Sequence, residues 1–231
     1  TLDRYLDFDL PQFAYSLMTR SQRISHENLR VRDPAWLDGM ERWFWSGNAG
    51  RNQPVQPMFT PFTIGDLTLP NRIVIPPMLT YGADADGRAN DFHTVHYGSR
   101  ALGGAGLMMT EMLAVSAEGR ATPACPGLYD DSHVERWRAI NDFAHRHSAT
   151  RTCAQIGHAG ARAACRMPED GYDVPLAEPW DILSASPQPW KTGGLCPREM
   201  TEADMHRIRD AFVAATLRAD EAGFDMIEVQ A

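Results

Sequence analysis

The sequence predicts an α/β fold built on a parallel sheet, and favours the first half of a (β/α)₈ TIM barrel preceded by a short helical segment. Strand-like and helix-like segments alternate between residues 73 and 229, which indicates parallel strands joined by helices. A short hairpin precedes the first of these strands, where it would plug the bottom of a barrel. An open doubly wound sheet also fits four strands, but the hairpin favours the barrel. A complete barrel needs about 250 residues, so residues 58–231 make roughly half of one.

The composition is that of an ordinary globular protein, with 43% hydrophobic and 23% charged residues in a chain of 231. The net charge is −8, and no run of Lys or Arg indicates a nucleic-acid or membrane-surface partner. The longest apolar stretches have the length of strands, so no membrane span is predicted. No signal peptide is recognisable, and the four scattered cysteines are interpreted as reduced thiols, so we expect a cytoplasmic protein.

Residues 1–45 are helical in character, are too few to form a core alone, and are expected to pack either on the following domain or on a domain missing upstream. Asp33 and Pro34 begin a helix, because Asp is a good N-cap and the missing N–H of Pro costs nothing at the first helical position. An apolar stripe at helical spacing follows, formed by Trp36, Leu37, Met40, Trp43 and Phe44. Residues 46–57 are small and polar and are expected to be a linker. The chain lacks an initiator Met, which also indicates a piece of a longer protein.

Residues 58–231 form the second predicted unit, whose elements follow in a regular order. A hairpin is expected at 62–64 and 67–69. The strand at 73–75 is β-branched, as in strands buried on both faces, and two prolines stop it because neither can donate to a sheet ladder. The other predicted elements are a helix at 91–102, a strand at 106–110, a helix at 131–147 capped by Asp131 or Ser132, a strand at 152–156, a helix at 201–222 and a strand at 224–229.

The last third of the chain carries two further expectations. Residues 157–200 form a long, Pro-rich connection, and connections of this length are usually functional lids or insertions. The helix after it begins with Thr201 and Asp204 in a capping-box arrangement and ends at Gly223. Its predicted buried stripe consists of Met205, Ile208, Phe212, Ala215 and Ala219.

Barrel active sites are assembled just past the carboxyl ends of the strands. Here those positions hold turns rich in backbone groups, amides and an aromatic hydroxyl: Pro77, Met78, Leu79, Thr80, Tyr81, Glu111, Met112, Gln155, His158 and Gln230. They include no close pair of carboxylates and no Ser-His-Asp order, which argues against hydrolysis. The Gln155 amide could accept from a ring N–H and donate to a ring carbonyl, so this set of residues suits a flat heterocycle.

At this point residues 58–231 resemble the N-terminal half of the Old Yellow Enzyme family of FMN-dependent barrel reductases. The matching stretches, in chain order, are 59–62 (FTPF), 69–74 (LPNRIV), Pro77-Met78 with Tyr81, 93–97 (HTVHY), 119–120 (GR), 155–160 (QIGHAG) and 222–225 (AGFD). The resemblance implies hydride transfer from NAD(P)H through FMN to an activated unsaturated small-molecule substrate. The FMN phosphate site and the proton donor are expected beyond Ala231, so the isolated chain is expected to be inactive.

The resemblance also implies which residues bind the cofactor. Pro77, Met78 and Leu79 would line the flavin ring. Met112 would offer a backbone contact near its reactive edge, and Gln155 would bond the pyrimidine edge. Leu79 departs from the family pattern, because many relatives have Cys or Thr at this position and Leu cannot donate a hydrogen bond to a flavin carbonyl.

On the substrate side, the resemblance implies that Tyr81 faces the bound substrate, although this residue could also be an aromatic at the rim of the site. Gln230 is the second departure from the pattern. It stands where relatives have the first His of a pair that holds the substrate carbonyl. The expected substrate is therefore not an ordinary enone.

A second resemblance concerns residues 1–45, where 16–21 (SLMTRS) and 25–29 (SHENL) are similar to the tail of a flavoprotein hydroxylase domain. That combination is found in bifunctional aromatic acyl-CoA monooxygenase/reductases of the anthraniloyl-CoA monooxygenase and salicyloyl-CoA hydroxylase type. It implies an aromatic-derived acyl-CoA substrate, FAD in an upstream domain not present here, and a homo-oligomeric complete protein that takes part in aromatic degradation.

Two other functions fit the same residues. His93, His96 and Glu111 could serve a metal-assisted lyase or hydrolase, although helix packing and capping explain the two histidines more simply, and no metal is expected. The chain could also be a non-catalytic fragment that binds only its parent domains. His158 could be either a functional group or a loop histidine whose hydrogen bonds are satisfied locally.

Overall fold

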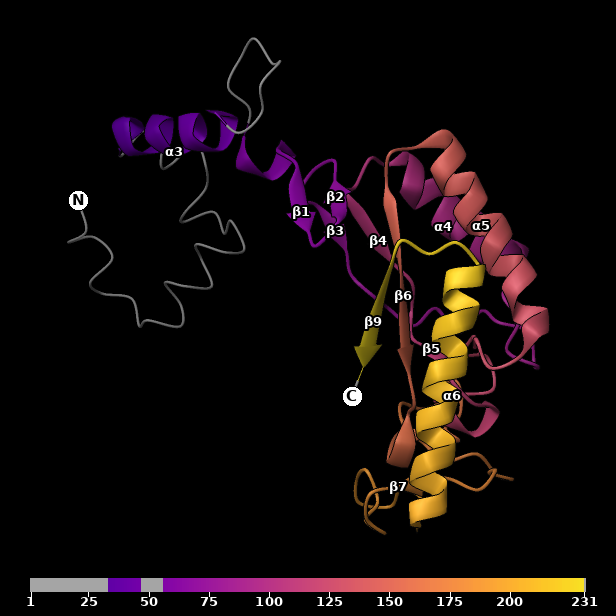
Figure 1. Cartoon of the computed structure of the whole chain (residues 1–231). Helices are drawn as coiled ribbons and strands as arrows, with labels where there is room; N and C mark the ends of the chain where they lie inside the picture. Colours follow the sequence, from indigo (N-terminus) through magenta and orange to yellow (C-terminus); the bar gives the residue numbers. More distant parts are fainter. Residues whose placement is uncertain (1–32, 47–55, 231) are drawn as a thin grey trace. The chain divides into compact units, whose positions relative to one another are not determined.

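The computed structural model describes residues 33–46 and 56–230 (Figure 1). The chain divides between Pro61 and Phe62 into two compact units. In the first unit, helix α3 spans Pro34–Ser46. The Trp36 amide donates to Asp33 Oδ1 at 3.0 Å, which confirms Asp33 as the cap. The expected stripe is only partly buried, because Leu37 is buried while Trp36 and Trp43 are exposed.

The other expectations for the N-terminal part fall largely outside the described residues. They include the helical character of residues 1–32 and most of the linker at 46–57. The described end of that segment forms a short 3₁₀ helix, η2, at Pro57–Phe59. The Thr60 hydroxyl donates to the Pro57 carbonyl oxygen at 2.7 Å and so closes this turn.

The second unit begins with the expected hairpin. Strands β1 (Phe62–Ile64) and β2 (Leu67–Leu69) pair antiparallel around Gly65, whose φ of +57° is the left-handed conformation that such a turn requires. The Arg72 guanidinium lies 4.7 Å from the centroid of the Phe62 ring, a cation–π contact that ties the hairpin to the chain that follows it.

Four parallel strands in chain order form the sheet of this unit. They are β3 (Val74–Ile75), β4 (Leu107–Met109), β6 (Arg151–Gly157) and β9 (Met226–Gln230), and each pairs in parallel with the one before it. Sequential order without reversal is that of a (β/α) barrel, whereas the strand order of a doubly wound sheet reverses at a switch point. The sheet therefore corresponds to the first half of a barrel.

A bulge of one extra residue interrupts the second barrel strand after β4. Beyond the bulge the strand continues as β5 (Leu113–Ala114). Met109 pairs with Cys153 and Leu113 with Ile156, so three residues of this strand face two of β6. Such a bulge re-aims side chains and often lies beside an active site. The expected strand at 106–110 is therefore shorter than predicted and is followed by a second piece.

Three helices cover one side of the sheet: α4 (Asp91–Leu102), α5 (Val134–His147) and α6 (Glu202–Glu221) (Figure 1). The core lies between them and the strands. Trp137 of α5 is its largest fully buried side chain and packs with Ile140, Ala215 and Ala219. Helices on this one side agree with a barrel, in which they form the outer layer.

The helix ends agree with the expected caps in two of three cases. Thr201 and Asp204 form the predicted capping box at the start of α6, and Gly223 follows its end with a φ of +80°. The expected cap at Asp131 or Ser132 is wrong. A 3₁₀ turn, η4 (Asp131–His133), precedes α5, and the Asp130 side chain accepts from the Ser132 amide at 2.9 Å.

Residues 157–200 contain short elements instead of one continuous loop. The 3₁₀ helices η5 (Gly160–Arg162) and η6 (Pro168–Asp170) are followed by strands β7 (Leu183–Ser184) and β8 (Arg198–Glu199), which pair with each other in parallel. This connection has a small hydrophobic core of its own, formed by Ala163, Ala164 and Ile182. It is therefore a folded insertion next to the carboxyl ends of the barrel strands.

Two burial expectations are wrong. The strand at 73–75 is not buried on both faces, since Val74 is 44% exposed; among the described residues β3 pairs only with β4 and is an edge strand. Met205, in the first turn of α6, is exposed, while Ala215 and Ala219 are buried as predicted. None of the helices that the structure describes has the length and apolarity to cross a membrane.

Candidate active site

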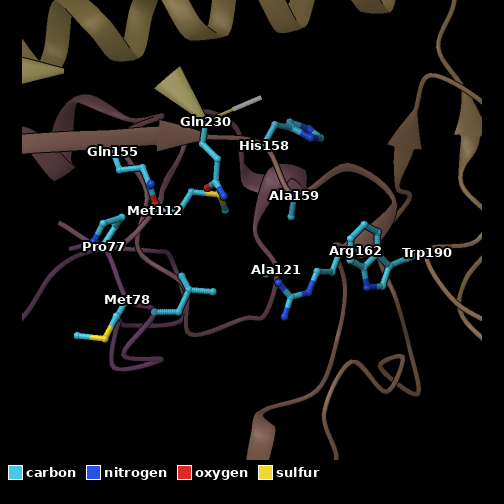
Figure 2. Close-up of a pocket in the computed structure, with 11 residues that line it drawn as sticks. Pro77, Met78, Met112, Ala121, Gln155, His158, Ala159, Arg162, Trp190 and Gln230 are labelled. Atoms are coloured by element: carbon cyan, nitrogen blue, oxygen red, sulfur yellow. The ribbon is translucent and has the colours of Figure 1, made fainter. Parts of the chain in front are cut away.

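A cavity of about 370 Å³ lies at the carboxyl ends of the barrel strands (Figure 2). Six of the seven residues expected to bind cofactor or substrate line it: Pro77, Met78, Leu79, Met112, Gln155 and Gln230. Because they come from four different strand ends, the parallel sheet is what brings them together. The size is within the range of small-molecule sites.

One wall of the cavity is apolar. Pro77, Met78 and Leu79 follow β3, and Met112 comes from the bulge. Met112 packs closely on the β6 backbone, where a Cβ atom at Gly157 would lie 2.8 Å from its Sδ atom. Any side chain at residue 157 would therefore displace Met112, which lines the cavity. The side chains of these residues can contact the face of a flat ring, but they have no donor for its polar edge.

Gln155 supplies polar groups beside that wall. Its backbone N–H, which faces the bulge, donates to Thr110 Oγ1 at 3.1 Å. Its side-chain Nε2 donates to Glu228 Oε1 at 3.2 Å, so one N–H is used and the other N–H and the carbonyl oxygen remain for a ligand. The residue is almost fully buried, and a ligand with both a donor and an acceptor would complete its hydrogen bonds.

Glu111 anchors the turn that carries the apolar wall. Its carboxylate accepts from the Thr80 amide at 2.8 Å and from the Thr80 hydroxyl at 2.7 Å. The Tyr97 hydroxyl donates to the same carboxylate at 3.2 Å and accepts from the Glu111 amide at 2.9 Å. Burial raises the pKa of Glu111, although the hydrogen bonds from Thr80 and Tyr97 oppose this. A buried carboxylate thus joins the ends of β3 and β4.

His93 belongs to this buried cluster. Its Nδ1 accepts from the Asn90 amide at 3.2 Å in a capping box at the start of α4, which confirms the interpretation as helix capping. Its Nε2 lies 3.6 Å from Glu111 Oε1. Within residues 33–46 and 56–230, no group of three or more His, Cys, Asp or Glu side chains could hold a metal ion. The geometry gives the metal-dependent alternative no support.

Tyr81 is the expected site residue that does not line the cavity. It lies on the same turn as Leu79, with a φ of +55° that is uncommon for an aromatic residue. Burial raises the pKa of its hydroxyl, and the neighbouring Arg162 lowers it. Tyr81 is therefore close to the charged groups of the insertion, and its contact with substrate stays a prediction.

His158 lines the cavity beyond the end of β6. The Gly160 amide donates to its Nδ1 at 3.0 Å, so the neutral ring carries its proton on Nε2. Burial lowers the pKa of this imidazole and keeps it neutral. Its Nδ1 is satisfied within the loop, whereas Nε2 has no partner among the described residues.

Three lining residues were not predicted individually: Ala121, Arg162 and Trp190. Arg162 and Trp190 belong to the long connection, on the opposite side of the cavity from Pro77 in Figure 2. The length of this connection did indicate a functional insertion. No local pattern distinguishes Trp190 from the other aromatic residues around it, because only the folding of the connection brings its ring to the cavity.

A half barrel whose strand ends form an apolar wall and an amide edge is typical of flavin-dependent barrel oxidoreductases. The chain belongs to the NADH:flavin oxidoreductase / NADH oxidase family, whose model matches residues 57–231. This confirms the resemblance to the Old Yellow Enzyme family, whose members bind FMN and take hydride from NAD(P)H.

The similar proteins support the same assignment. NADPH dehydrogenases of Geobacillus sp. and Bacillus pumilus are 36% and 38% identical over 173 residues, which cover 74% of this chain and 47% of each relative. The solved structure of morphinone reductase is 25% identical with a TM-score of 0.62, and covers 74% of this chain and 47% of that one. Old Yellow Enzyme from Pichia sp. is 25% identical with a TM-score of 0.64, and covers 75% and 45%. The chain thus spans about half the length of these proteins, which confirms the partial barrel.

Proposed function

We propose that this chain forms the flavin-facing half of an FMN-dependent oxidoreductase that passes hydride from NAD(P)H to an activated, unsaturated small molecule. The observation that supports this most directly is the cavity itself, because its apolar wall stands beside the buried Gln155 amide. When bound, FMN supplies the hydride chemistry, so the protein has to bind, orient and exclude water.

The residues present fit a flavin. An isoalloxazine has flat apolar faces and a polar pyrimidine edge on which donors and acceptors alternate. Pro77, Leu79 and Met112 offer apolar contact, while the free N–H and carbonyl oxygen of Gln155 offer the complementary polar pair. None of the lining residues within 33–46 and 56–230 is an Asp or Glu that would repel the electron-rich reduced ring. Glu111 holds the apolar wall in place through Thr80.

FMN titration and anaerobic reduction test this function. The 231-residue chain alone is expected to bind FMN with a Kd above about 1 μM, because the phosphate site of this barrel class follows strands seven and eight. A protein completed to the length of its relatives is expected to bind FMN firmly and to lose its yellow absorbance when NADH or NADPH is added without oxygen. A completed protein that takes up no flavin would refute the proposed function.

The substrate class is a finer proposal. An aromatic-derived acyl-CoA is supported by the resemblance of residues 16–21 and 25–29 to a hydroxylase tail. Gln230, which stands at a position that the resemblance assigns to a His, argues against an ordinary enone. In that setting FAD would bind an upstream monooxygenase domain, and the complete protein would be a cytoplasmic homo-oligomer in aromatic degradation. Turnover of an aromatic acyl-CoA, compared with that of the free acid, tests this proposal.

Leu79→Thr is expected to raise the reduction potential of the flavin-loaded protein by about 30–60 mV. Reduction places negative charge along the N1–C2=O and C4=O edge of the ring. A hydroxyl that donates to this edge contributes about 1.5–3 kcal/mol, and for two electrons about 1.4 kcal/mol equals 30 mV. Leu79 lines the cavity but cannot donate.

Potentiometric titration measures this shift, and Leu79→Val is the matched control because Val has the shape of Thr without the hydroxyl. A potential that stays unchanged or falls in the Thr variant, or that rises equally in the Val variant, would show that residue 79 only packs against the ring.

A further inference from the structure

The side chain of Arg162 enters the cavity from the long connection. Figure 2 shows it extended toward Ala121, with the Trp190 ring beside it. Its Nε atom donates to Asp173 Oδ1 at 2.8 Å, and its Nη2 donates to the Tyr172 hydroxyl at 3.0 Å. Its Nη1 has no hydrogen-bond partner in the part of the chain that the structure describes. The guanidinium is thus held along one edge, and donors on its other edge remain for a ligand.

Two aromatic rings flank this guanidinium. The Arg162 Cζ atom lies 5.4 Å from the centroid of the Tyr172 ring and 6.0 Å from that of Trp190. Both rings are largely exposed, at 63% and 59%, so they are not part of a core. Lys191 donates to the Tyr172 carbonyl oxygen at 2.9 Å and joins the two segments that carry the rings. Exposed aromatic faces beside a cavity can stack on a flat ligand.

Arg162 brings a permanent positive charge to this end of the cavity, and Asp173 pairs with it at 2.8 Å. Among the described residues that line the cavity, Arg162 is the one whose side chain is always charged, and none is an Asp or Glu. Asp173 pairs with the Nε edge, outside the set of lining residues. It therefore orients the guanidinium without occupying the donors that face the cavity, a form of pre-organisation.

We propose that Arg162, Trp190 and Tyr172 form a subsite for a planar, unsaturated compound that carries an anionic oxygen, such as a carboxylate or phenolate. The anionic oxygen binds Nη1 of Arg162, and the planar part stacks on the exposed rings. This inference rests on the proposed hydride transfer to an unsaturated small molecule, and it names an anionic class of substrate for that reaction in place of an acyl-CoA, whose thioester group is uncharged. Every residue of the subsite lies within the 231-residue chain.

The test compares trans-cinnamate with its neutral amide, cinnamamide, which has the same planar skeleton. Each compound is titrated into the 231-residue chain, and binding is followed by NMR at the indole N–H of Trp190, identified as the resonance that Trp190→Phe removes. Cinnamate is expected to bind about tenfold more tightly, the effect of one charge-assisted hydrogen bond at a partly exposed site.

Arg162→Gln is expected to abolish the difference between the two compounds, and Arg162→Lys to keep part of it, because Lys keeps the charge without the planar fork. Arg209→Gln is the matched control. It removes the same charge from an exposed arginine whose one ion-pair partner among the described residues is its neighbour Asp210, and the tenfold preference should persist. Inorganic phosphate is expected to shift the Trp190 resonance only at concentrations far higher than those at which cinnamate shifts it.

Equal affinity for the two compounds, no binding of either, or a preference that survives in Arg162→Gln would overturn the subsite. Phosphate binding as tight as that of cinnamate would also overturn it, since a bare anion site needs no aromatic rings. If circular dichroism shows that Arg162→Gln is unfolded, Arg162→Lys decides: a reduced preference for cinnamate supports the subsite, and an unchanged preference overturns it. The proposed function has an independent readout: if the completed protein lacks flavin, that function fails while the cinnamate preference persists.

Discussion

Replacing Glu111 by alanine is expected to lower the free energy of unfolding by about 3–5 kcal/mol. The change removes the acceptor of the Thr80 amide and hydroxyl, and each orphaned, part-buried donor costs roughly 1–3 kcal/mol. The vacated space adds a cavity term, because the Glu111 side chain is fully buried. The turn with Pro77 and Leu79 would lose its anchor, so we also expect weaker FMN binding by the completed protein.

Urea denaturation of the 231-residue chain at neutral pH measures the effect on stability. Glu111→Gln keeps the volume and an acceptor oxygen for Thr80, so it should cost less than half as much. Glu135→Ala, at an exposed position of α5, should change stability by no more than about 0.5 kcal/mol. A loss of under 1 kcal/mol in Glu111→Ala would mean that the turn is held by its prolines and not by the carboxylate.

Much of the barrel half was predictable, because buried strands and amphipathic helices carry local patterns. The β-branched run before Pro76 and the Thr201–Asp204 box each determine an element through their own backbone and side-chain chemistry. The bulge between Met109 and Leu113 was not predictable in this way. It depends on the register against β6, which only pairing between distant segments establishes.

The same division applies to the candidate site. Pro77, Leu79, Met112, Gln155 and Gln230 could be predicted because they follow recognised strands, and a parallel sheet necessarily brings its carboxyl ends together. The insertion residues Arg162 and Trp190 reach the cavity through ion pairs and ring contacts that have no sequence period, as with Arg162 and Asp173. The length of the connection predicts an insertion that covers the site. It does not predict which side chains of the insertion enter the cavity.

The buried histidine of α4 makes stability depend on pH. His93 is fully buried, and burial lowers its pKa from 6.5 to about 4. The unfolded chain therefore binds this proton below about pH 6.5, whereas the folded chain binds it only near pH 4. Stability from this group is complete above pH 6.5 and is lost as the pH falls toward 4. The contribution of Glu111 to stability has the opposite pH dependence. Its pKa is raised in the folded state, so stability is lost as the pH rises above the unfolded value of 4.5.

His93→Gln is therefore expected to remove about 3 kcal/mol of acid destabilisation between pH 6.5 and 4, since each unit of pKa shift corresponds to about 1.36 kcal/mol. Gln does not titrate, and at this position of a capping box its carbonyl oxygen can still accept from the Asn90 amide. The variant should be less stable than the parent chain at pH 7, and its free energy of unfolding should fall less steeply in acid.

The measurement is urea denaturation of both proteins across this range. The difference between the two curves isolates His93, because Glu111, His96 and His158 titrate in both proteins. Parallel curves would mean that His93 keeps its proton in the folded state, and that Glu111, 3.6 Å away, stabilises the imidazolium enough to offset its burial.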